Sequence, residues 1–365
     1  MQDNNGQDLG SSVPTWPWIL VTIIPVIAVL VAINKRKRKP SPITATIPST
    51  YTIDMVDIAD DCDESSPCVD QLSVLPTPAL PDQNSVGEGR TFAKSNYKLF
   101  YLRAKRASFQ HRLLGAVHDM LGLYTARINP TLDQADVEKG VHEFMQKIQG
   151  DAFKNDEALE KDVDAAAEYL WTSGKRHAIV KGTELCSVLN AVIRDDVANE
   201  IKAAAPIFRS INTRRVYRTK TGLNTTYPSN GKTWRGGGFR KDFEPFFKRM
   251  KGKKYRVPGF LATSNKQSVA ATFAFQADNN HPCVIWCIMF DPRGELQPKY
   301  RVQHLTFVSK SLIPGEGEYL FPPYSVFTLL STKWSAELIQ PHEFTVRAAR
   351  DNQLEPEDLP LIPWY

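Results

Sequence analysis

The sequence predicts an α+β fold, in which a helical half at residues 91–212 precedes a mostly antiparallel β half at residues 213–345. Three patterns lead to this prediction. An uncharged apolar run predicts a membrane helix ahead of the domain, apolar residues at three-to-four spacing predict the helices, and short β-branched and aromatic runs predict the strands. The chain has 365 residues, enough for one large or two small domains with tails.

The apolar run at residues 16–34 predicts a transmembrane helix. Its core, WPWILVTIIPVIAVLVAI, carries no charge and has about the length that a helix needs to cross a bilayer. Five basic residues, Lys35 to Lys39, follow at once, so the positive-inside rule places residues 1–15 outside and the C-terminal domain in the cytosol. The alternatives are an unusual signal sequence, a buried core helix, and a lumenal or extracellular domain.

Composition argues against several classes of function. The net charge is +5, and without the five charges of the basic run the chain is near neutral, so net charge indicates no nucleic-acid partner. The five cysteines form no CxxC pair and the seven histidines show no ligand spacing, so no disulfide framework and no metal site is predicted. We expect Cys283 and Cys287, four apart in an apolar run, to lie in the core on one face of a strand.

The helical half follows a predicted linker at residues 35–90, which is first basic and then acidic, rich in Pro and Ser, and poor in large apolar residues. Four segments then show helical periodicity, at residues 99–128, 133–148, 156–174 and 183–208. Asp133 is the expected N-cap of the second segment, and Gly174 the expected end of the third.

The β half begins near residue 213, where short apolar runs alternate with Gly, Pro and Asn. The predicted strands lie within residues 214–219, 254–264, 282–290, 305–310, 317–323, 324–332 and 343–349. One helix is predicted among them, at residues 265–276, and residues 346–365 are expected to form an irregular, Pro-rich tail.

Three motifs in the β half carry candidate chemistry, and each has a simpler interpretation when taken alone. Trp234–Phe239, WRGGGF, is also consistent with a turn. Gly259–Ser264, GFLATS, is also consistent with a strand whose final serine caps the next helix. Glu316–Tyr324, EGEYLFPPY, is also consistent with an exposed acidic turn. On a strand, however, glutamates at i and i+2 share a face, where they repel unless one is protonated or a cation arrives.

Together and in this order, the motifs resemble the arginine, Ser-Thr-Ser and Glu-x-Glu elements of arginine-specific mono-ADP-ribosyltransferases. The resemblance covers about residues 90 to 345 and includes the helical segment Thr183–Arg194. Its most specific part is EYLFPPYSVF, an acidic residue followed by a hydrophobic strand and a Pro-Pro turn. The resemblance implies a split β core, NAD as substrate, and a protein acceptor with an exposed arginine.

The resemblance also implies catalytic roles. Glu318 matches the catalytic glutamate, and a carboxylate there would stabilise the oxocarbenium-like ribose that forms when the nicotinamide bond breaks. Glu316 matches the glutamate that faces the acceptor guanidinium, while Thr263 and Ser264 match the motif that props the strand beside the catalytic residue. The first serine of that motif is Ala262 here, so the hydroxyl that would steady the glutamate is either missing or supplied by Thr263.

The NAD-binding residues are implied in the same way. Arg235 corresponds to the NAD-binding arginine, whose planar guanidinium suits a pyrophosphate, and Arg218 is the competing candidate. Gly236 and Gly237 would let the backbone approach the ligand, with the nicotinamide amide bonded near Gly236. Phe273 is a candidate to stack on nicotinamide, although a place in the helix–sheet core is the favoured interpretation.

The functional hypothesis is therefore transfer of ADP-ribose from NAD to a protein arginine, on a domain tethered to a membrane. Two alternatives stay open. One is a glycohydrolase that only consumes NAD, and the other is a non-catalytic binding module with the same fold, which Ala262 favours.

Overall fold

The computed structural model describes residues 90–155, 159, 161–213, 227–228, 230–275, 282–308, 315–336 and 340–363. All of them belong to one of the two units into which the chain divides, Pro78–Tyr365. The predicted transmembrane helix at residues 16–34, residues 35–89 of the predicted linker, and the predicted strand at residues 214–219 with Arg218 lie outside the described residues. Within the described ranges, no helix is both long and apolar enough to span a membrane.

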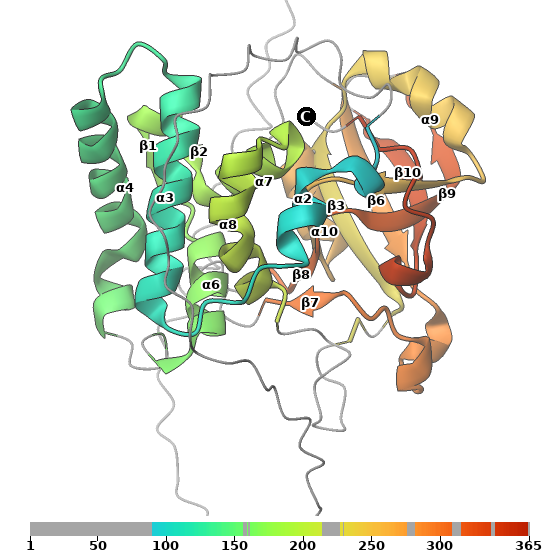
Figure 1. The fold of residues 1–365 in the computed structure, drawn as a ribbon. Coiled ribbons are helices and arrows are strands. Elements are labelled where there is room, and N and C mark those ends of the chain that lie inside the picture. The colour runs from blue at the N-terminus through green and yellow to red at the C-terminus, as the bar shows by residue number, and fades with distance from the viewer. Residues whose placement is uncertain are drawn as a thin grey trace, which may run out of the picture. The chain divides into compact units, whose positions relative to one another are not determined.

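Each of the four predicted helical segments contains helix, which confirms the helical half (Figure 1). The elements are η1 (Phe92–Lys94), α2 (Asn96–Tyr101), α3 (Gln110–Ile128), α4 (Gln134–Asn155), α6 (Val163–Trp171), the hairpin of β1 (Arg176–His177) and β2 (Thr183–Glu184) around η2 (Ala178–Val180), α7 (Leu185–Asp195) and α8 (Ala198–Ile211). Asp133 accepts a hydrogen bond from the backbone N–H of Asp136 at 2.7 Å, so it caps α4 as predicted.

The predicted segment at residues 183–208 divides at Asp196, a break that periodicity did not indicate. Asp196 has a φ of 56°, in the left-handed region where a helix ends. Its carboxylate accepts hydrogen bonds from the backbone N–H groups of Asn96 and Tyr97, at 3.0 and 3.1 Å. The break between α7 and α8 therefore also holds the first turn of α2.

The β half forms an eight-stranded sheet in the order β4-β9-β10-β6-β3-β5-β8-β7. The strands are β3 (Lys232–Gly238), β4 (Lys254–Val257), β5 (Leu261–Ser264), β6 (Cys283–Met289), β7 (Thr306–Phe307), β8 (Glu318–Phe321), β9 (Ser325–Lys333) and β10 (His342–Ala348); the helices are α9 (Glu244–Met250) and α10 (Gln267–Phe275). In the described part of the sheet every neighbouring pair is antiparallel except β10 with β6, which confirms the predicted α+β class with a mostly antiparallel sheet.

The sheet is split between β3 and β5. Every residue of β3 pairs with β6, whereas the described register between β3 and β5 is a single pair, Trp234 with Ser264. From Arg235 onward, β3 therefore has no described strand pairing with β5. The interpretation of WRGGGF as a turn is wrong, because this segment is strand β3.

The glycine-rich sequence of β3 follows from the close approach of α10. A Cβ at Gly236 would lie 1.7 Å from the carbonyl oxygen of Ala270 and 2.6 Å from the backbone nitrogen of Ala274. Only glycine allows the helix backbone to lie this close to the strand. Gly236 thus makes room for α10, and the predicted approach of its backbone to a ligand stays a prediction.

Alternating residues of β5 and β8 face two different apolar cores. Ala262 and Leu320 pair directly and pack with the helical half, whereas Leu261 pairs with Phe321 and packs within the β half. Because successive side chains of a strand point to opposite faces, Ser264 and its partner Glu318 lie on the helical side.

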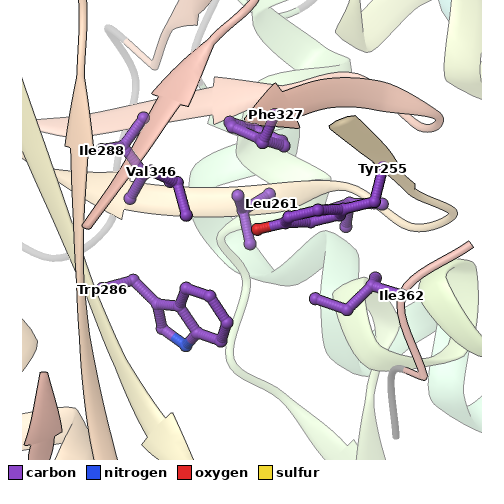
Figure 2. Close-up of a pocket in the computed structure, with 8 residues that line it drawn as sticks. Tyr255, Leu261, Trp286, Ile288, Phe327, Val346 and Ile362 are labelled. Atoms are coloured by element: carbon purple, nitrogen blue, oxygen red, sulfur yellow. The ribbon is translucent and has the colours of Figure 1, made fainter. Parts of the chain in front are cut away.

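The β core contains a small apolar cavity (Figure 2). Its lining residues are Tyr255, Val257, Leu261, Trp286, Ile288, Phe327, Val346 and Ile362. A volume of about 10 Å³ holds at most one water molecule, so this cavity is too small to bind a substrate.

The segment after residue 345 contributes to this core as well. Ile362 is buried there, and the buried guanidinium of Arg256 donates hydrogen bonds to the backbone carbonyls of Glu355 and Pro356 at 3.0 and 2.8 Å. The backbone N–H of Arg256 also donates to the carbonyl oxygen of Pro360. The Pro-rich C-terminal segment is therefore held against β4.

Asn190 on α7 connects the helical half to the start of β5 through two hydrogen bonds. The backbone N–H of Phe260 donates to Asn190 Oδ1 at 2.8 Å, and Asn190 Nδ2 donates to the carbonyl of Phe260 at 3.3 Å. A Cβ at Gly259 would lie 2.9 Å from Asn190 Oδ1, so a glycine there lets the amide approach. One side chain in the segment Thr183–Arg194 thus fixes the strand that carries the second motif.

Candidate functional site

Glu318 is the first residue of β8 and is buried, with 6% of its surface exposed. It pairs with Ser264 at the end of β5, on the sheet face toward the helices. The interpretation of its segment as an exposed acidic turn is therefore wrong for this residue. A buried carboxyl group is costly to ionise and calls for hydrogen-bonding partners, so its surroundings decide its chemistry.

One partner of Glu318 comes from the helical half. Trp171, the last residue of α6, donates a hydrogen bond from its indole Nε1 to Glu318 Oε1 at 3.0 Å. Trp171 is itself only 5% exposed. The contact joins residues 147 positions apart and ties the candidate catalytic carboxylate to α6.

The surroundings raise the pKa of Glu318 from 4.5 to about 7. Burial is the largest cause, and the nearby carboxylates of Glu316 and Glu168 raise the pKa further. The Trp171 hydrogen bond and the Arg235 guanidinium act in the opposite direction and lower it. Glu318 is thus a group that changes charge near neutral pH, as acid–base and cation-stabilising residues of enzymes often do.

Arg235 lies in the middle of β3, next to the split. Its Nη1 donates to the backbone carbonyl oxygen of Ala262 on β5 at 2.9 Å, so the guanidinium bridges the two parts of the sheet. It lies close enough to Glu318 to lower its pKa. The structure thus brings Arg235 and Glu318 together, whereas Arg218 lies outside the described residues.

Glu316 does not share a strand with Glu318, which corrects the expectation from i, i+2 spacing. Gly317 has a φ of 58°, so the extended backbone begins only at Glu318. The loop is instead held from β5, because Ser264 Oγ donates to the Glu316 carbonyl and the Asn265 N–H donates to the Gly317 carbonyl at 3.1 Å. The Glu316 carboxylate still lies close enough to raise the pKa of Glu318.

Thr263 does not supply a hydroxyl to Glu318. It pairs with Tyr319 and its Oγ1 donates to the Tyr319 carbonyl at 3.0 Å, so it faces the β core. Ser264 has the supporting position instead, since its Oγ donates to the Glu316 carbonyl and accepts from the Lys266 N–H at 3.0 Å. The second motif therefore props the glutamate loop through Ser264, and Thr263 is a structural residue of β5.

The side chain of Phe273 is 45% exposed and that of Phe275 is 60% exposed, both on α10. The favoured interpretation of Phe273 as a core residue is therefore wrong, because Ala270 and Ala274 are the buried residues of this helix. Small side chains occupy the contact face because α10 lies so close to Gly236. Phe273 thus remains free of the core, and its stacking on nicotinamide stays a prediction.

The cysteines and acidic residues of the described ranges bear on two predictions, the absence of a metal site and the core position of Cys283 and Cys287. Within these ranges, no three His, Cys, Asp or Glu side chains gather as metal ligands would. Cys283 is buried in β6, whereas Cys287 is only partly buried, so the expected core position holds for the first of the two. Burial is also the main cause that raises the pKa of Cys186 to about 12, so this thiol near Glu318 stays protonated.

The motifs did not indicate Trp171, Glu168 or Asn190, although all three help to build the site. The signal for the first two was weak, a glutamate and a tryptophan in an alanine-rich helix whose last seven residues are buried. Asn190 carried no signal beyond its place in the segment Thr183–Arg194. Residues on a distant helix enter such a site through tertiary contacts, which periodicity does not reveal.

No protein-family model and no curated protein matches the chain. Several solved structures are similar at low identity. The ADP-ribosyltransferase HopU1 of Pseudomonas syringae pv. Tomato DC3000 is 15% identical with a TM-score of 0.36, and the match covers 64% of this chain and 97% of that one. Plx2a, an ADP-ribosyltransferase toxin from Paenibacillus larvae, is 15% identical with a TM-score of 0.33, over 52% of this chain and 86% of that one.

C3stau2 from S. aureus, solved with NAD, is 13% identical with a TM-score of 0.32, over 60% of this chain and 96% of that one. All three TM-scores lie below 0.5. Likeness at this level assigns no activity to the chain. The functional proposal rests on the residues around Glu318.

Proposed function

We propose that the protein transfers ADP-ribose from NAD to an arginine side chain of a protein acceptor and releases nicotinamide. The observation that carries this proposal is the buried Glu318, whose pKa is altered by both Arg235 and Glu316. These two neighbours have the charges that the two substrates require. NAD carries an anionic pyrophosphate, which suits a guanidinium, and the acceptor carries a cationic guanidinium, which suits a carboxylate.

Glu318 is the residue that acts on the reacting carbon in this proposal. Cleavage of the bond between nicotinamide and ribose leaves positive charge on the ribose, as in glycoside hydrolysis. The ionised carboxylate stabilises that cation strongly because it acts from a buried position that water does not screen. The electrons of the broken bond leave with nicotinamide, a nitrogen of the acceptor arginine bonds to the ribose carbon, and that nitrogen loses a proton to a base such as Glu316.

Arg235 and the strand that carries it fit the NAD-binding role. From Arg235 onward, β3 has no described strand pairing with β5. Backbone N–H and C=O groups on that edge can therefore bond the nicotinamide amide. A Cβ at Gly237 would meet no atom within 4 Å, so the strand has open space at this position. The Arg235 guanidinium stands beside this edge and supplies the charge for the pyrophosphate.

A non-catalytic binding module is the second candidate, and Ala262 is the observation that favours it. A chain that no longer catalyses has no need of a hydroxyl beside its glutamate. The Trp171 hydrogen bond to Glu318 argues against this candidate, because the carboxylate still has a donor that holds it. The two candidates differ in whether the folded protein turns over NAD.

Replacement of Glu316 tests the transfer step. We expect Glu316→Gln to lower ADP-ribose transfer by about 100-fold while NAD hydrolysis continues, because the acceptor loses its carboxylate and the ribose cation keeps Glu318. The measurement follows label from adenine-labelled NAD into an arginine-rich acceptor protein, with nicotinamide release in parallel. The pH midpoint of nicotinamide release should also fall, since Glu316 raises the pKa of Glu318.

The control for this experiment is Glu343→Gln, an exposed glutamate on β10 that pairs with Lys333. It should leave both transfer and hydrolysis unchanged. Equal loss of transfer and hydrolysis in Glu316→Gln would contradict the acceptor role. If the folded wild-type protein turns over no NAD, the enzymatic proposal is wrong and the non-catalytic binding module is the remaining candidate.

We also propose that residues 16–34 tether the domain to a membrane with the domain on the cytosolic side. The basis is the uncharged apolar run followed directly by Lys35 to Lys39. Asn224-Thr225-Thr226 is a glycosylation sequon and offers a topology test. Expressed in a eukaryotic cell, the protein should sediment with membranes and carry no glycan at Asn224. A glycan there would place the domain on the other side.

A further inference from the structure

The orientation of the Glu318 carboxylate depends on the group that donates a hydrogen bond to it. In the family that the sequence resembles, a serine hydroxyl at the position of Ala262 would steady the glutamate. Ala262 has no hydroxyl, and Thr263 donates to Tyr319 on the opposite face of the strand. Ser264 is committed to the Glu316 carbonyl. Among the described residues of β5, no side chain therefore donates to Glu318, and the donor comes from α6 instead.

We propose that Trp171 is the positioning residue for Glu318, and that its indole N–H does the work of the serine hydroxyl that position 262 lacks. This inference rests on the proposed function, because orienting Glu318 matters only if Glu318 acts on a substrate. The contact is direct, from Trp171 Nε1 to Glu318 Oε1 at 3.0 Å. The contact engages Oε1, so in this proposal Oε2 is the oxygen that serves the reacting ribose.

The indole is held rigidly enough to position a second group. Trp171 ends α6, whose N-cap is Asp162. The Oδ1 atom of Asp162 accepts hydrogen bonds from the backbone N–H groups of Asp164 and Ala165 at 3.1 Å. The indole ring packs against Phe260, with ring centroids 5.0 Å apart. The backbone of Phe260 is in turn held by two hydrogen bonds with the Asn190 side chain on α7. A rigid aromatic side chain loses little entropy when it forms a hydrogen bond, so the contact can hold the carboxylate in one orientation.

Position 262 and Trp171 both belong to the apolar core between the sheet and the helical half. Ala262 pairs with Leu320 on the helical face of the sheet, and Trp171, Phe260 and Leu320 belong to the apolar cluster that Ala262 packs against. Residue 262 is two positions from Ser264, which pairs directly with Glu318. A hydroxyl at position 262 would therefore lie on the side of the sheet where Glu318 needs a donor.

The electrostatic effect of Trp171 agrees with this geometry. A donor to the ionised carboxylate lowers its pKa, and Trp171 does so against burial and against the carboxylates of Glu316 and Glu168. The other groups that face Glu318 are the Arg235 guanidinium from β3, which also lowers the pKa, and the protonated Cys186 thiol from α7. Removing only the indole N–H should thus both loosen Glu318 and raise its pKa.

The test compares Trp171→Phe with the wild-type protein, because phenylalanine keeps an aromatic ring and loses the N–H. We expect kcat for nicotinamide release to fall about 10- to 100-fold, while KM for NAD changes by less than about twofold, since misorientation affects the reacting group more than NAD binding. The pH midpoint of the reaction should rise. Adding Ala262→Ser to Trp171→Phe should restore at least about tenfold of the lost rate by returning the serine donor.

The matched control is Trp334→Phe, a tryptophan that packs against Phe239 and Phe344 in the β half. It should leave kcat and the pH midpoint unchanged. Trp171→Phe with a wild-type kcat and midpoint overturns the inference and leaves the proposed function standing. A rate loss that Ala262→Ser does not restore also overturns it, because the loss then comes from packing.

A second measurement separates the inference from the function. The carboxyl carbon of Glu318 can be titrated by NMR in ¹³C-labelled protein without NAD, with Glu318→Gln to assign the signal. The expected result is a higher midpoint in Trp171→Phe than in the wild type, and an unchanged midpoint overturns the contact. Absence of NAD turnover by the wild-type protein instead overturns the proposed function, and with it the positioning role in that reaction.

Discussion

Glu318→Gln is expected to stabilise the protein more at pH 8 than at pH 5, with a difference of roughly 2 to 3 kcal/mol in the free energy of unfolding. The reason is the cost of holding an ionised carboxylate in a buried place. Burial is the main cause that raises the pKa of Glu318 to about 7, so at pH 8 the folded protein carries a charge that its surroundings disfavour. The neutral amide of the variant avoids this cost and can still accept the Trp171 N–H.

The sign of this effect follows from proton linkage. In the unfolded chain Glu318 has its ordinary pKa of 4.5, whereas in the folded protein the pKa is about 7. The folded state therefore binds this proton more tightly, and the stability that the group contributes is complete below pH 4.5 and is lost as the pH rises through about 7. Only the wild-type protein has this pH-dependent term, because the variant has no proton to release.

Urea unfolding of both proteins at pH 5 and pH 8 measures the difference directly. The control is again Glu343→Gln, whose exposed carboxylate should give the same small change at both pH values. A stabilisation by Glu318→Gln that is equal at the two pH values would contradict the raised pKa. The same variant is expected to be inactive, so stability and activity would move in opposite directions, as they do at many enzyme sites.

Arg235→Lys is expected to raise KM for NAD by roughly 10- to 100-fold, the range for loss of a hydrogen bond to a charged group. Lysine keeps the positive charge but lacks the planar fork that binds two phosphate oxygens. The Arg235 guanidinium donates to the Ala262 carbonyl and has further N–H groups for a phosphate, whereas a lysine ammonium offers no such rigid, planar arrangement. Binding to NAD should therefore fall more than kcat does.

Steady-state kinetics with NAD, together with calorimetric titration of NAD into Glu318→Gln, would measure this effect. Arg293→Lys serves as the control, because Arg293 is an exposed arginine that pairs with Asp291 away from the split. It should leave KM unchanged. An unchanged KM in Arg235→Lys would show that Arg235 does not bind NAD, and Arg218 would then be the candidate for the NAD-binding arginine.

The order of the motifs and the strand alternation account for most of what the sequence revealed about the site. The predicted strands at residues 254–264 and 317–323 form neighbouring strands, so the second and third motifs meet across β5 and β8. The apolar residues that precede Ser264 and follow Glu318 made these strands recognisable, because both strands are largely buried. Hydrophobic pattern thus predicted the scaffold that brings these two motifs together.

What the sequence left open depends on contacts between distant segments. The glycines of WRGGGF have low strand propensity, yet β3 forms because β6 pairs along its whole length and α10 needs space at Gly236. The sequence did not decide whether the hydroxyl that steadies Glu318 is missing or is supplied by Thr263. The answer depends on the sheet face on which each residue of β5 lies. The donor to Glu318 turned out to be Trp171, which no local pattern could connect to a residue 147 positions away.

In the proposed reaction Glu318 promotes cleavage of the nicotinamide bond of NAD. Nicotinamide release at pH 8 by the wild-type protein and by Glu318→Gln, both confirmed as folded, tests it most directly. We expect measurable release by the wild type and a rate at least about 1,000-fold lower in the variant. Equal rates in the two proteins, or no release by the folded wild type, would contradict it.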